Sequence, residues 1–457
     1  MPNKTMFEPF RIKSVEPIRV SKREDRIKYL EAAKLNPFLL RAEDVMIDWL
    51  TDSGTGAMSS AQWAAIMQGD ESYAGAKSFF RLKEAISDVT GMEHFIPTHQ
   101  GRAAEKVFFG ASCKAGDLIP SNSHFDTTRG NLEFLGVEAV DLVIPEGLEP
   151  ATIHPFKGNI DLAKVEDLLK AQGGRIPFGM LTITNNTGGG QPVSMANIRE
   201  YSQLLKKYGK PLVMDVCRFA ENAMFIKMRE PGFENKGIPE ICRETFGHAD
   251  AATMSAKKDG MVNMGGFIVL RDDRWLDKVR ELLILSEGFL TYGGMAGRDL
   301  EALAVGLAEG MDEDYLRYRL LQASYFGEKL EGAGIGFIKP TGGHAVYVDA
   351  KSVLPDMPME QYPAWSLANA LYIEGGVRGV EIGSVMFGKR LPDGTETYHS
   401  MELVRLAFPR RMYTLSHFDY AADALSRVKD GAKSIRGVRI TKQAQFLRHF
   451  TAEFDWA

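Results

Sequence analysis

The feature that most constrains the fold is the alternation of helical patterns with short apolar runs in the middle of the chain. Helical stretches at Ile160–Ala171 and Ile198–Tyr208 alternate with β-branched or apolar runs at Gly179–Thr184, Pro211–Met214 and Gly266–Leu270. This alternation predicts a parallel sheet joined by crossover helices. Ligands of such sheets bind beyond the carboxyl ends of the strands, so the residues after each run are the candidates for a site.

The C-terminal third of the chain has a different pattern. A long helical passage from Asp299 to Glu331 leads into Gly336–Ala350, Gly376–Glu381 and Glu402–Ala407, which are typical of strands in a smaller α+β unit. A chain of 457 residues is long enough for two such cores. We therefore expect a large domain at 57–310 and a small domain at 311–457, with an N-terminal segment at 1–56 packing against the small domain.

The composition argues against several classes of binding partner. The formal net charge of −5 and the pI near 6.1 give no general attraction to nucleic acid, and no Lys/Arg-rich run forms a basic patch. The chain has no apolar run long enough to span a membrane and no apolar leader near its start, so we expect neither insertion nor secretion. Its three cysteines, Cys113, Cys217 and Cys242, lack the spacing of a disulfide framework or a zinc site, which favours reduced thiols in the cytoplasm.

The run Pro211–Met214 delivers a carboxylate, Asp215, and then an arginine, Arg218. A buried carboxylate needs a cationic partner, and a protonated pyridine nitrogen of a ligand would be one. The alternative is that Asp215 caps the helix expected to begin around Phe219.

A polar segment, Met254–Gly260, follows another short apolar stretch and contains Ser255, Lys257 and Lys258. A lysine forms a Schiff base only when part of it is neutral, and a cationic neighbour such as Lys257 lowers its pKa in the required direction. The alternative is a pair of solvated lysines on a turn.

Two further segments suit a flat, phosphorylated ligand. Thr98–Glu105 runs through Gly101 and Arg102 into a helix, whose N-terminal amides and arginine suit a phosphate dianion. Asn122–Arg129 offers the ring of Phe125 for stacking and an acid, Asp126, directly after it. An ordinary capped helix start and a turn with a buried phenylalanine are the alternatives.

Together these segments resemble the β-eliminating lyases of the pyridoxal-phosphate (PLP) dependent fold-type-I superfamily. The resemblance covers nearly the whole chain through Glu8–Ile12, Leu50–Thr55, Gly69–Gly75, Pro97–Arg102, Gly189–Ser194, Arg218–Ala223, Met254–Asp259, Thr291–Gly294, Gly342–Ala345 and Leu447–Thr451. It implies an aspartate-aminotransferase-like α/β fold, with a mostly parallel central sheet in the large domain and a smaller α+β domain. It also implies a cytoplasmic homotetramer built as a dimer of dimers.

The resemblance implies specific roles. Lys258 would form the Schiff base and remove the substrate α-proton, Asp215 would pair with the pyridine nitrogen, and Arg218 would lie near the cofactor phenolate. The cofactor would also be held by Gln100, Gly101, Arg102, Ser255, Phe125 and Asn186. Arg405 would bind the substrate carboxylate with Thr51, Ser53 and Asn186, and Tyr73 would assist proton transfer to the leaving ring, across a subunit boundary. Glu71, Gly54 and Asn263 match the family's site for potassium or ammonium.

Three positions bear on the substrate. Family members that cleave tyrosine resemble one another in a threonine after the stacking phenylalanine and an arginine that meets the phenol hydroxyl; here these positions are Asp126 and Ile382. An apolar Ile382 suits an indole face, Asp126 is an acceptor for an indole N–H, and His449 also matches the tryptophan-cleaving branch. We therefore expect L-tryptophan to yield indole, pyruvate and ammonia by β-elimination. L-tyrosine, giving phenol, is the alternative.

Two other functions are more distant alternatives. The same chemistry would permit β-elimination from cysteine or serine derivatives as a side activity. Activity toward substrates with an aromatic ring distinguishes the two aromatic lyases from such a broad lyase. A non-catalytic binding or regulatory protein is expected to lose the Schiff-base lysine or the carboxylate-binding arginine, but Lys258 and Arg405 are both present.

Overall fold

The computed structural model describes residues 6–391 and 393–457, so residues 1–5 of the expected N-terminal segment lie outside the described residues. The chain divides into two compact units. One comprises Ser53–Gly147 and His154–Arg319, and is called here the sheet unit. The other comprises Met1–Asp52, Leu148–Ile153 and Leu320–Ala457, and is called the terminal unit.

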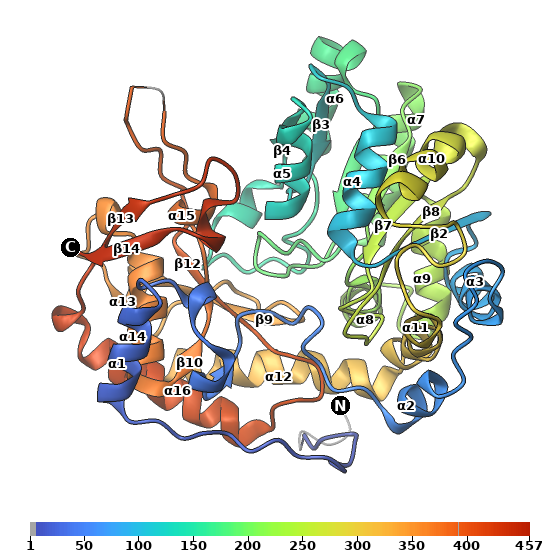
Figure 1. Ribbon diagram of the computed structural model, residues 1–457. Helices are drawn as coiled ribbons and strands as arrows, with labels where there is room; N and C mark the ends of the chain where they lie inside the picture. Colours follow the sequence, from blue (N-terminus) through green and yellow to red (C-terminus); the bar gives the residue numbers. More distant parts are fainter. Residues whose placement is uncertain (1–5, 392) are drawn as a thin grey trace. The chain divides into compact units, whose positions relative to one another are not determined.

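The sheet unit is built on a five-stranded sheet in the order β2-β8-β7-β6-β5 (Figure 1). The strands are β2 (His94–Thr98), β5 (Gly179–Thr182), β6 (Leu212–Asp215), β7 (Ala251–Ser255) and β8 (Gly266–Leu270). β5, β6 and β7 pair in parallel, whereas β8 runs antiparallel to both β7 and β2. The carboxyl ends of β2, β5, β6 and β7 therefore meet at one edge, where ligands of such sheets bind.

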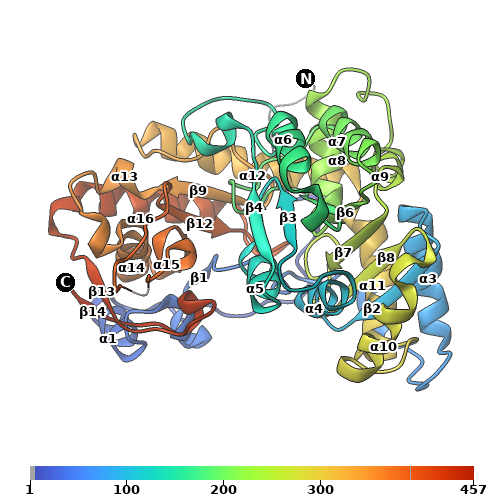
Figure 2. The same cartoon turned by 90° about the horizontal axis from the view of Figure 1, so that it is seen from above.

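Helices cover both faces of this sheet, with α4 (Gly101–Ser112) and α10 (Leu276–Ser286) on one side and α7 (Met195–Lys207) and α8 (Phe219–Arg229) on the other (Figure 2). A second, parallel pair, β3 (Leu118–Ser121) and β4 (Glu138–Asp141), lies near β5. The remaining helices of the unit are α2 (Ser60–Ile66), α3 (Lys77–Thr90), α5 (Asp126–Phe134), α6 (Leu162–Gln172), α9 (Ile238–Gly247) and α11 (Gly297–Gly310).

Local sequence explains these elements. β5, β6, β7 and β8 are buried at every residue, as expected for central strands covered on both faces. α3 buries Phe79, Leu82, Ile86 and Val89, which recur at helical spacing, and it ends at Gly91 in the left-handed region at φ +64°. The predicted passage from Asp299 to Glu331 proves to be two helices, α11 and α12 (Glu313–Gly332), separated by Met311 and Asp312.

The terminal unit contains a three-stranded antiparallel sheet in the order β11-β12-β9. Its strands are β9 (Ala345–Asp349), β11 (Val380–Ile382) and β12 (Leu403–Ala407). Trp49 packs edge-on against Phe326 and Phe408 in its core. The other elements are α1 (Arg23–Ala32), β1 (Ile47–Asp48), α13 (Ala350–Val353), α14 (Pro363–Gly375), β10 (Val377–Arg378), α15 (Ser384–Phe387), α16 (Leu415–Asp430), β13 (Val438–Lys442) and β14 (Glu453–Trp456).

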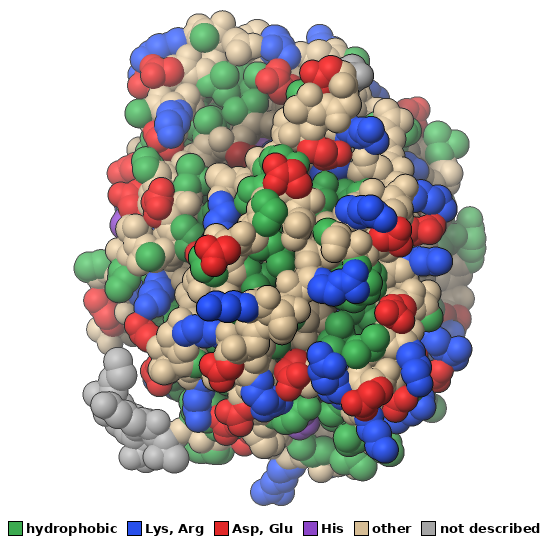
Figure 3. Space-filling view, turned by 90° about the vertical axis from the view of Figure 1, so that its left-hand side faces the viewer, with side chains coloured by type: hydrophobic (Ala, Val, Ile, Leu, Met, Phe, Trp, Pro, Cys, Tyr) green, Lys and Arg blue, Asp and Glu red, His purple; other side chains and the backbone are tan. Residues whose placement is uncertain are grey.

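The surface is mixed in charge. On the face drawn in Figure 3, basic and acidic side chains are interspersed with apolar ones. Within the described residues, every helix is too short or too polar to cross a membrane.

Candidate active site

Asp215 and the Lys257–Lys258 pair meet at the carboxyl edge of the sheet. Asp215 is the last residue of β6 and is buried, while Lys258 follows the end of β7 by three residues. Cys217 links the two segments, because its backbone N–H donates to Asp215 Oδ1 at 3.2 Å and its Sγ accepts from Ser255 N at 3.2 Å. Burial and the charge of Asp215 raise the pKa of the Cys217 thiol, and the Lys258 charge opposes them. The charges of Asp215 and Lys258 therefore both affect the pKa of the Cys217 thiol.

The alternative role of Asp215 as a helix cap is wrong. α8 begins at Phe219, and its N-cap residue Arg218 makes no side-chain capping bond. The first-turn amides of Ala220 and Glu221 donate instead to Asp259 Oδ2, at 2.8 and 3.1 Å. Sequence reasoning missed Asp259, because the acid that caps this helix lies about forty residues further along the chain.

The two lysines lie on a turn and are half-buried, so they are only partly solvated. Desolvation lowers the pKa of Lys257, and the charges of Lys258 and Arg102 lower it further. The positive charge of Arg102, in the first turn of α4, therefore lies close enough to Lys257 to lower its pKa. Three cationic side chains near one another favour an anionic ligand.

A cradle for an anion lies where α4 begins. A β-carbon added at Gly101 would stand 2.4 Å from Ser255 Cβ, so only glycine allows this approach. The side chain of the N-cap residue Gln100 does not cap the helix, and Gln100 bridges to Gly265 in the sheet. Gln100, Gly101, Arg102 and Ser255, all predicted from sequence, thus come together at a helix N-terminus, which is a favourable setting for phosphate.

Glu105, in the same helix, received no role in the sequence analysis. It is buried, and its Oε1 accepts a hydrogen bond from Thr128 Oγ1 of α5 at 2.5 Å. Burial raises the pKa of Glu105 to about 7, and the charges of Asp215 and Asp126 add to this rise. Glu105 belongs to the Thr98–Glu105 motif, but the sequence pattern does not show that its carboxyl group is buried.

Phe125 and Asp126 form the start of α5. Phe125 is the N-cap residue and is half-buried, and Asp126 is buried with Oδ1 accepting from Thr127 N at 2.6 Å. The segment carrying buried Asn186 is tied to the same turn, since Ser123 Oγ donates to Asn185 Oδ1 and Thr187 Oγ1 donates to the His124 carbonyl.

Of the three residues expected to hold a cation, the structure joins Asn263 to Gly54. Asn263 Nδ2 donates to the carbonyl oxygens of Gly54 and Gly56, at 2.8 and 3.2 Å. Glu71 instead pairs with Arg298 at 2.9 Å and accepts from Gly297 N. The part of the chain that the structure describes holds no cluster of three or more His, Cys, Asp or Glu side chains suited to a metal.

Tyr73 is 69% exposed. Its ring lies 5.8 Å from the ring of Phe289 and 5.2 Å from that of Tyr292, all within the sheet unit.

The remaining predicted residues belong to the terminal unit, except Ser53, which begins the sheet unit. Arg405 is buried in β12 between β9 and β11, and its Nη2 donates to the Leu50 carbonyl at 3.2 Å. Thr51 follows Leu50 and precedes Asp52, whose carboxylate pairs with buried Arg410 at 2.9 Å. The structure therefore brings Thr51 and Arg405 into one region of this unit.

Ile382 and His449 are both completely buried in the terminal unit. Ile382 packs in a cluster with Ile338, Tyr347, Met401 and Leu403. The His449 ring lies 5.7 Å from the Phe38 ring and 4.1 Å from the Phe450 ring. Their roles toward a substrate stay predictions.

Comparison with known proteins identifies the family of this chain. The Beta-eliminating lyase family matches residues 48–424. A tryptophanase from Salinibacter ruber is 58% identical over 448 residues, covering 98% of this chain and 95% of that protein. A tyrosine phenol-lyase from Symbiobacterium thermophilum is 47% identical over 449 residues, covering 98% of each chain. The chain belongs to the beta-eliminating lyase family.

The fold is also found in distant proteins of known structure. A serine palmitoyltransferase from Sphingomonas wittichii superposes with a TM-score of 0.60 at 14% identity, covering 90% of this chain and 97% of the other. This likeness confirms the predicted fold class.

Membership of the family implies PLP, and the residues of the sheet unit fit that cofactor. The helix N-terminus at Gly101, which packs closely against Ser255, suits its phosphate, and the buried carboxylate of Asp215 suits a protonated ring nitrogen. Lys258 supplies the amine, and the half-buried ring of Phe125 supplies a stacking surface.

Proposed function

We propose that this protein cleaves L-tryptophan by PLP-dependent β-elimination to indole, pyruvate and ammonia. The observation that carries the proposal is the identity of 58% with a tryptophanase, against 47% with a tyrosine phenol-lyase, each over 98% of the chain. Asp126 and Ile382 support the same substrate, because a carboxylate accepts from an indole N–H and an isoleucine offers no hydrogen bond to a phenol oxygen.

Bound PLP supplies an electron sink for the negative charge left at the substrate α-carbon. Lys258 holds the cofactor as its amine partner and then takes the α-proton at Nζ. Asp215 keeps the proton on the ring nitrogen, and its burial makes this charge pairing strong. Arg102 with Gln100, Gly101 and Ser255 fixes the phosphate, while Phe125, Asn186 and Arg218 hold the ring.

The substrate needs two further anchors. The guanidinium of Arg405 takes the α-carboxylate with two parallel hydrogen bonds, supported by Thr51, Ser53 and Asn186. The indole ring is a poor leaving group as a carbanion, so its ring carbon must be protonated first. Tyr73 would assist that proton transfer, and His449 would contribute to the substrate pocket.

The family resemblance also bears on the oligomeric state and on a bound monovalent cation. We infer a homotetramer in the cytoplasm, and a potassium or ammonium ion held by Glu71, Gly54 and Asn263. The exposed ring of Tyr73 supports an oligomer, because a phenol that acts in the active site of a neighbouring subunit must be exposed on the surface of its own subunit.

The substrate assignment is tested by exchanging the two discriminating side chains. The variant Asp126→Thr with Ile382→Arg is expected to raise kcat/KM for L-tyrosine relative to L-tryptophan by roughly 100-fold, because a new bidentate donor then meets the phenol oxygen. The two single variants are the controls. A double variant that keeps the full tryptophan preference would refute these specificity roles.

A further inference from the structure

The terminal unit contains a pocket that is built entirely from its own residues. The volume of the pocket is about 270 Å³, which corresponds to roughly nine water molecules at ~30 Å³ each. α1 lines it with Arg23, Ile27 and Glu31, which recur every four residues on one helix face. None of the residues that line it has a place in the proposed reaction.

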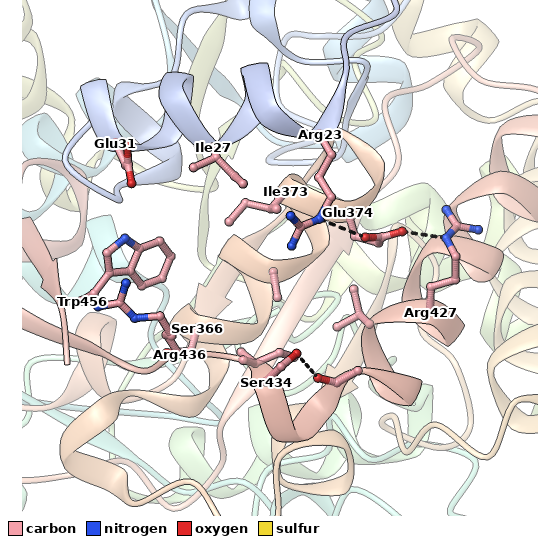
Figure 4. A pocket seen from close by; sticks show the side chains of 14 residues that line it. Arg23, Ile27, Glu31, Ser366, Ile373, Glu374, Arg427, Ser434, Arg436 and Trp456 are labelled. Atoms are coloured by element: carbon pink, nitrogen blue, oxygen red, sulfur yellow. Dashed lines mark hydrogen bonds and ion pairs between the residues drawn. The ribbon is translucent and has the colours of Figure 1, made fainter.

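The floor of the pocket is apolar. Ile27 of α1 and Ile373 of α14 point into the same space (Figure 4). Ala370, Val428 and Ile435 add to this surface. An apolar floor of this kind stabilises a ligand by removing its hydrocarbon surface from water.

The two sides of the pocket differ in their charge pairing. On one side, Glu374 bridges Arg23 at 3.6 Å and Arg427 at 2.8 Å, so one carboxylate is shared by two guanidinium groups (Figure 4). On the other side, the guanidinium of Arg436 lies 5.1 Å from the centre of the Trp456 ring. Among the residues that the structure describes, Arg436 makes no ion pair with an acid.

The lining as a whole has a net charge of +1, from three arginines and two glutamates, of which Glu31 lies on the side of Trp456 (Figure 4). A single excess positive charge suits a monoanion rather than a dianion such as phosphate. A guanidinium stacked on an indole keeps its in-plane N–H groups for a carboxylate, while the exposed part of the indole and the isoleucines suit a flat apolar body.

We propose that this pocket binds a small aromatic carboxylate, with its carboxylate on Arg436 and its ring between Trp456, Ile27 and Ile373. The site lies wholly in the terminal unit and is distinct from the lysine and phosphate cradle of the sheet unit. It does not depend on the identity of the reaction substrate.

The test is ¹⁹F NMR titration of the holoenzyme with 4-fluorobenzoate, with neutral 4-fluorobenzamide as the matched ligand. We expect saturable binding of the benzoate and much weaker binding of the amide. Arg436→Gln is expected to weaken benzoate binding by about tenfold or more, because a charge-assisted contact is lost. The matched control is Arg439→Gln, which alters an exposed arginine that pairs with Asp455 at 3.5 Å. It is expected to leave the affinity unchanged.

A benzoate could also occupy the proposed substrate site, so the titration is repeated in Arg405→Gln. Binding that persists in this variant supports the pocket. Loss of all binding in Arg405→Gln, equal affinity in Arg436→Gln and Arg439→Gln, or no saturation below about 10 mM would each overturn the proposal. Turnover of Arg436→Gln equal to that of the parent enzyme verifies that the variant is folded.

Discussion

The buried carboxyl of Glu105 gives the sharpest prediction for stability. Its pKa rises from 4.5 to about 7 on folding, first through burial and then through the charges of Asp215 and Asp126. Between these pH values the folded protein binds more protons than the unfolded chain, so stability falls as pH rises from about 4.5 through about 7. At about 1.4 kcal/mol for each tenfold change, the ionised carboxyl costs the folded state ~3 kcal/mol above pH 7.

Glu105→Gln removes this titration while keeping the shape of the side chain. The variant is expected to match the parent protein below about pH 4.5 and to exceed its free energy of unfolding by up to ~3 kcal/mol above about pH 7. Urea unfolding of both proteins between pH 4.5 and pH 8 measures the difference, and Glu240→Gln on the exposed surface is the matched control. Parallel pH profiles for the parent and Glu105→Gln would contradict a raised pKa of Glu105 in the folded protein.

Two further predictions concern the cofactor. Gly101→Ala places a β-carbon 2.4 Å from Ser255 Cβ, and we expect PLP affinity measured by equilibrium titration to fall by about tenfold or more. Gly173→Ala, where nothing lies within 4 Å, is the control, and equal affinities would contradict the phosphate cradle. Lys258→Ala is expected to abolish turnover and the visible band of the lysine–PLP Schiff base, while Lys257→Ala keeps this band. A Lys258→Ala protein that keeps both would exclude Lys258 as the cofactor lysine.

The parts of the fold that follow from local pattern were predictable. The run Gly266–Leu270 is β8 itself, and Asp215 ends β6 as the apolar run before it indicated. The direction of β8 was not predictable, because a fully buried strand has the same apolar sequence pattern whether it pairs in parallel or antiparallel. The break between α11 and α12 had a local signal in Asp312, whose carboxylate accepts from Tyr315 N at 2.8 Å.

Contacts between distant segments were not predictable from pattern. Asp259 caps α8 from about forty residues away, and no spacing rule relates the two. Likewise, Glu105 lies in a recognisable motif, but its raised pKa depends on burial beside Asp215, more than a hundred residues further along the chain. The complete burial of Ile382 in a side-chain cluster is likewise visible only in three dimensions.

The most direct test of the central claim is product analysis of the purified protein with PLP and potassium. L-tryptophan and L-tyrosine are compared side by side, with pyruvate measured by a coupled assay and indole and phenol measured directly. We expect indole and pyruvate in equal amounts from tryptophan, and little phenol from tyrosine. Phenol in excess would contradict the roles given to Asp126 and Ile382, and pyruvate from neither amino acid would contradict the proposed reaction.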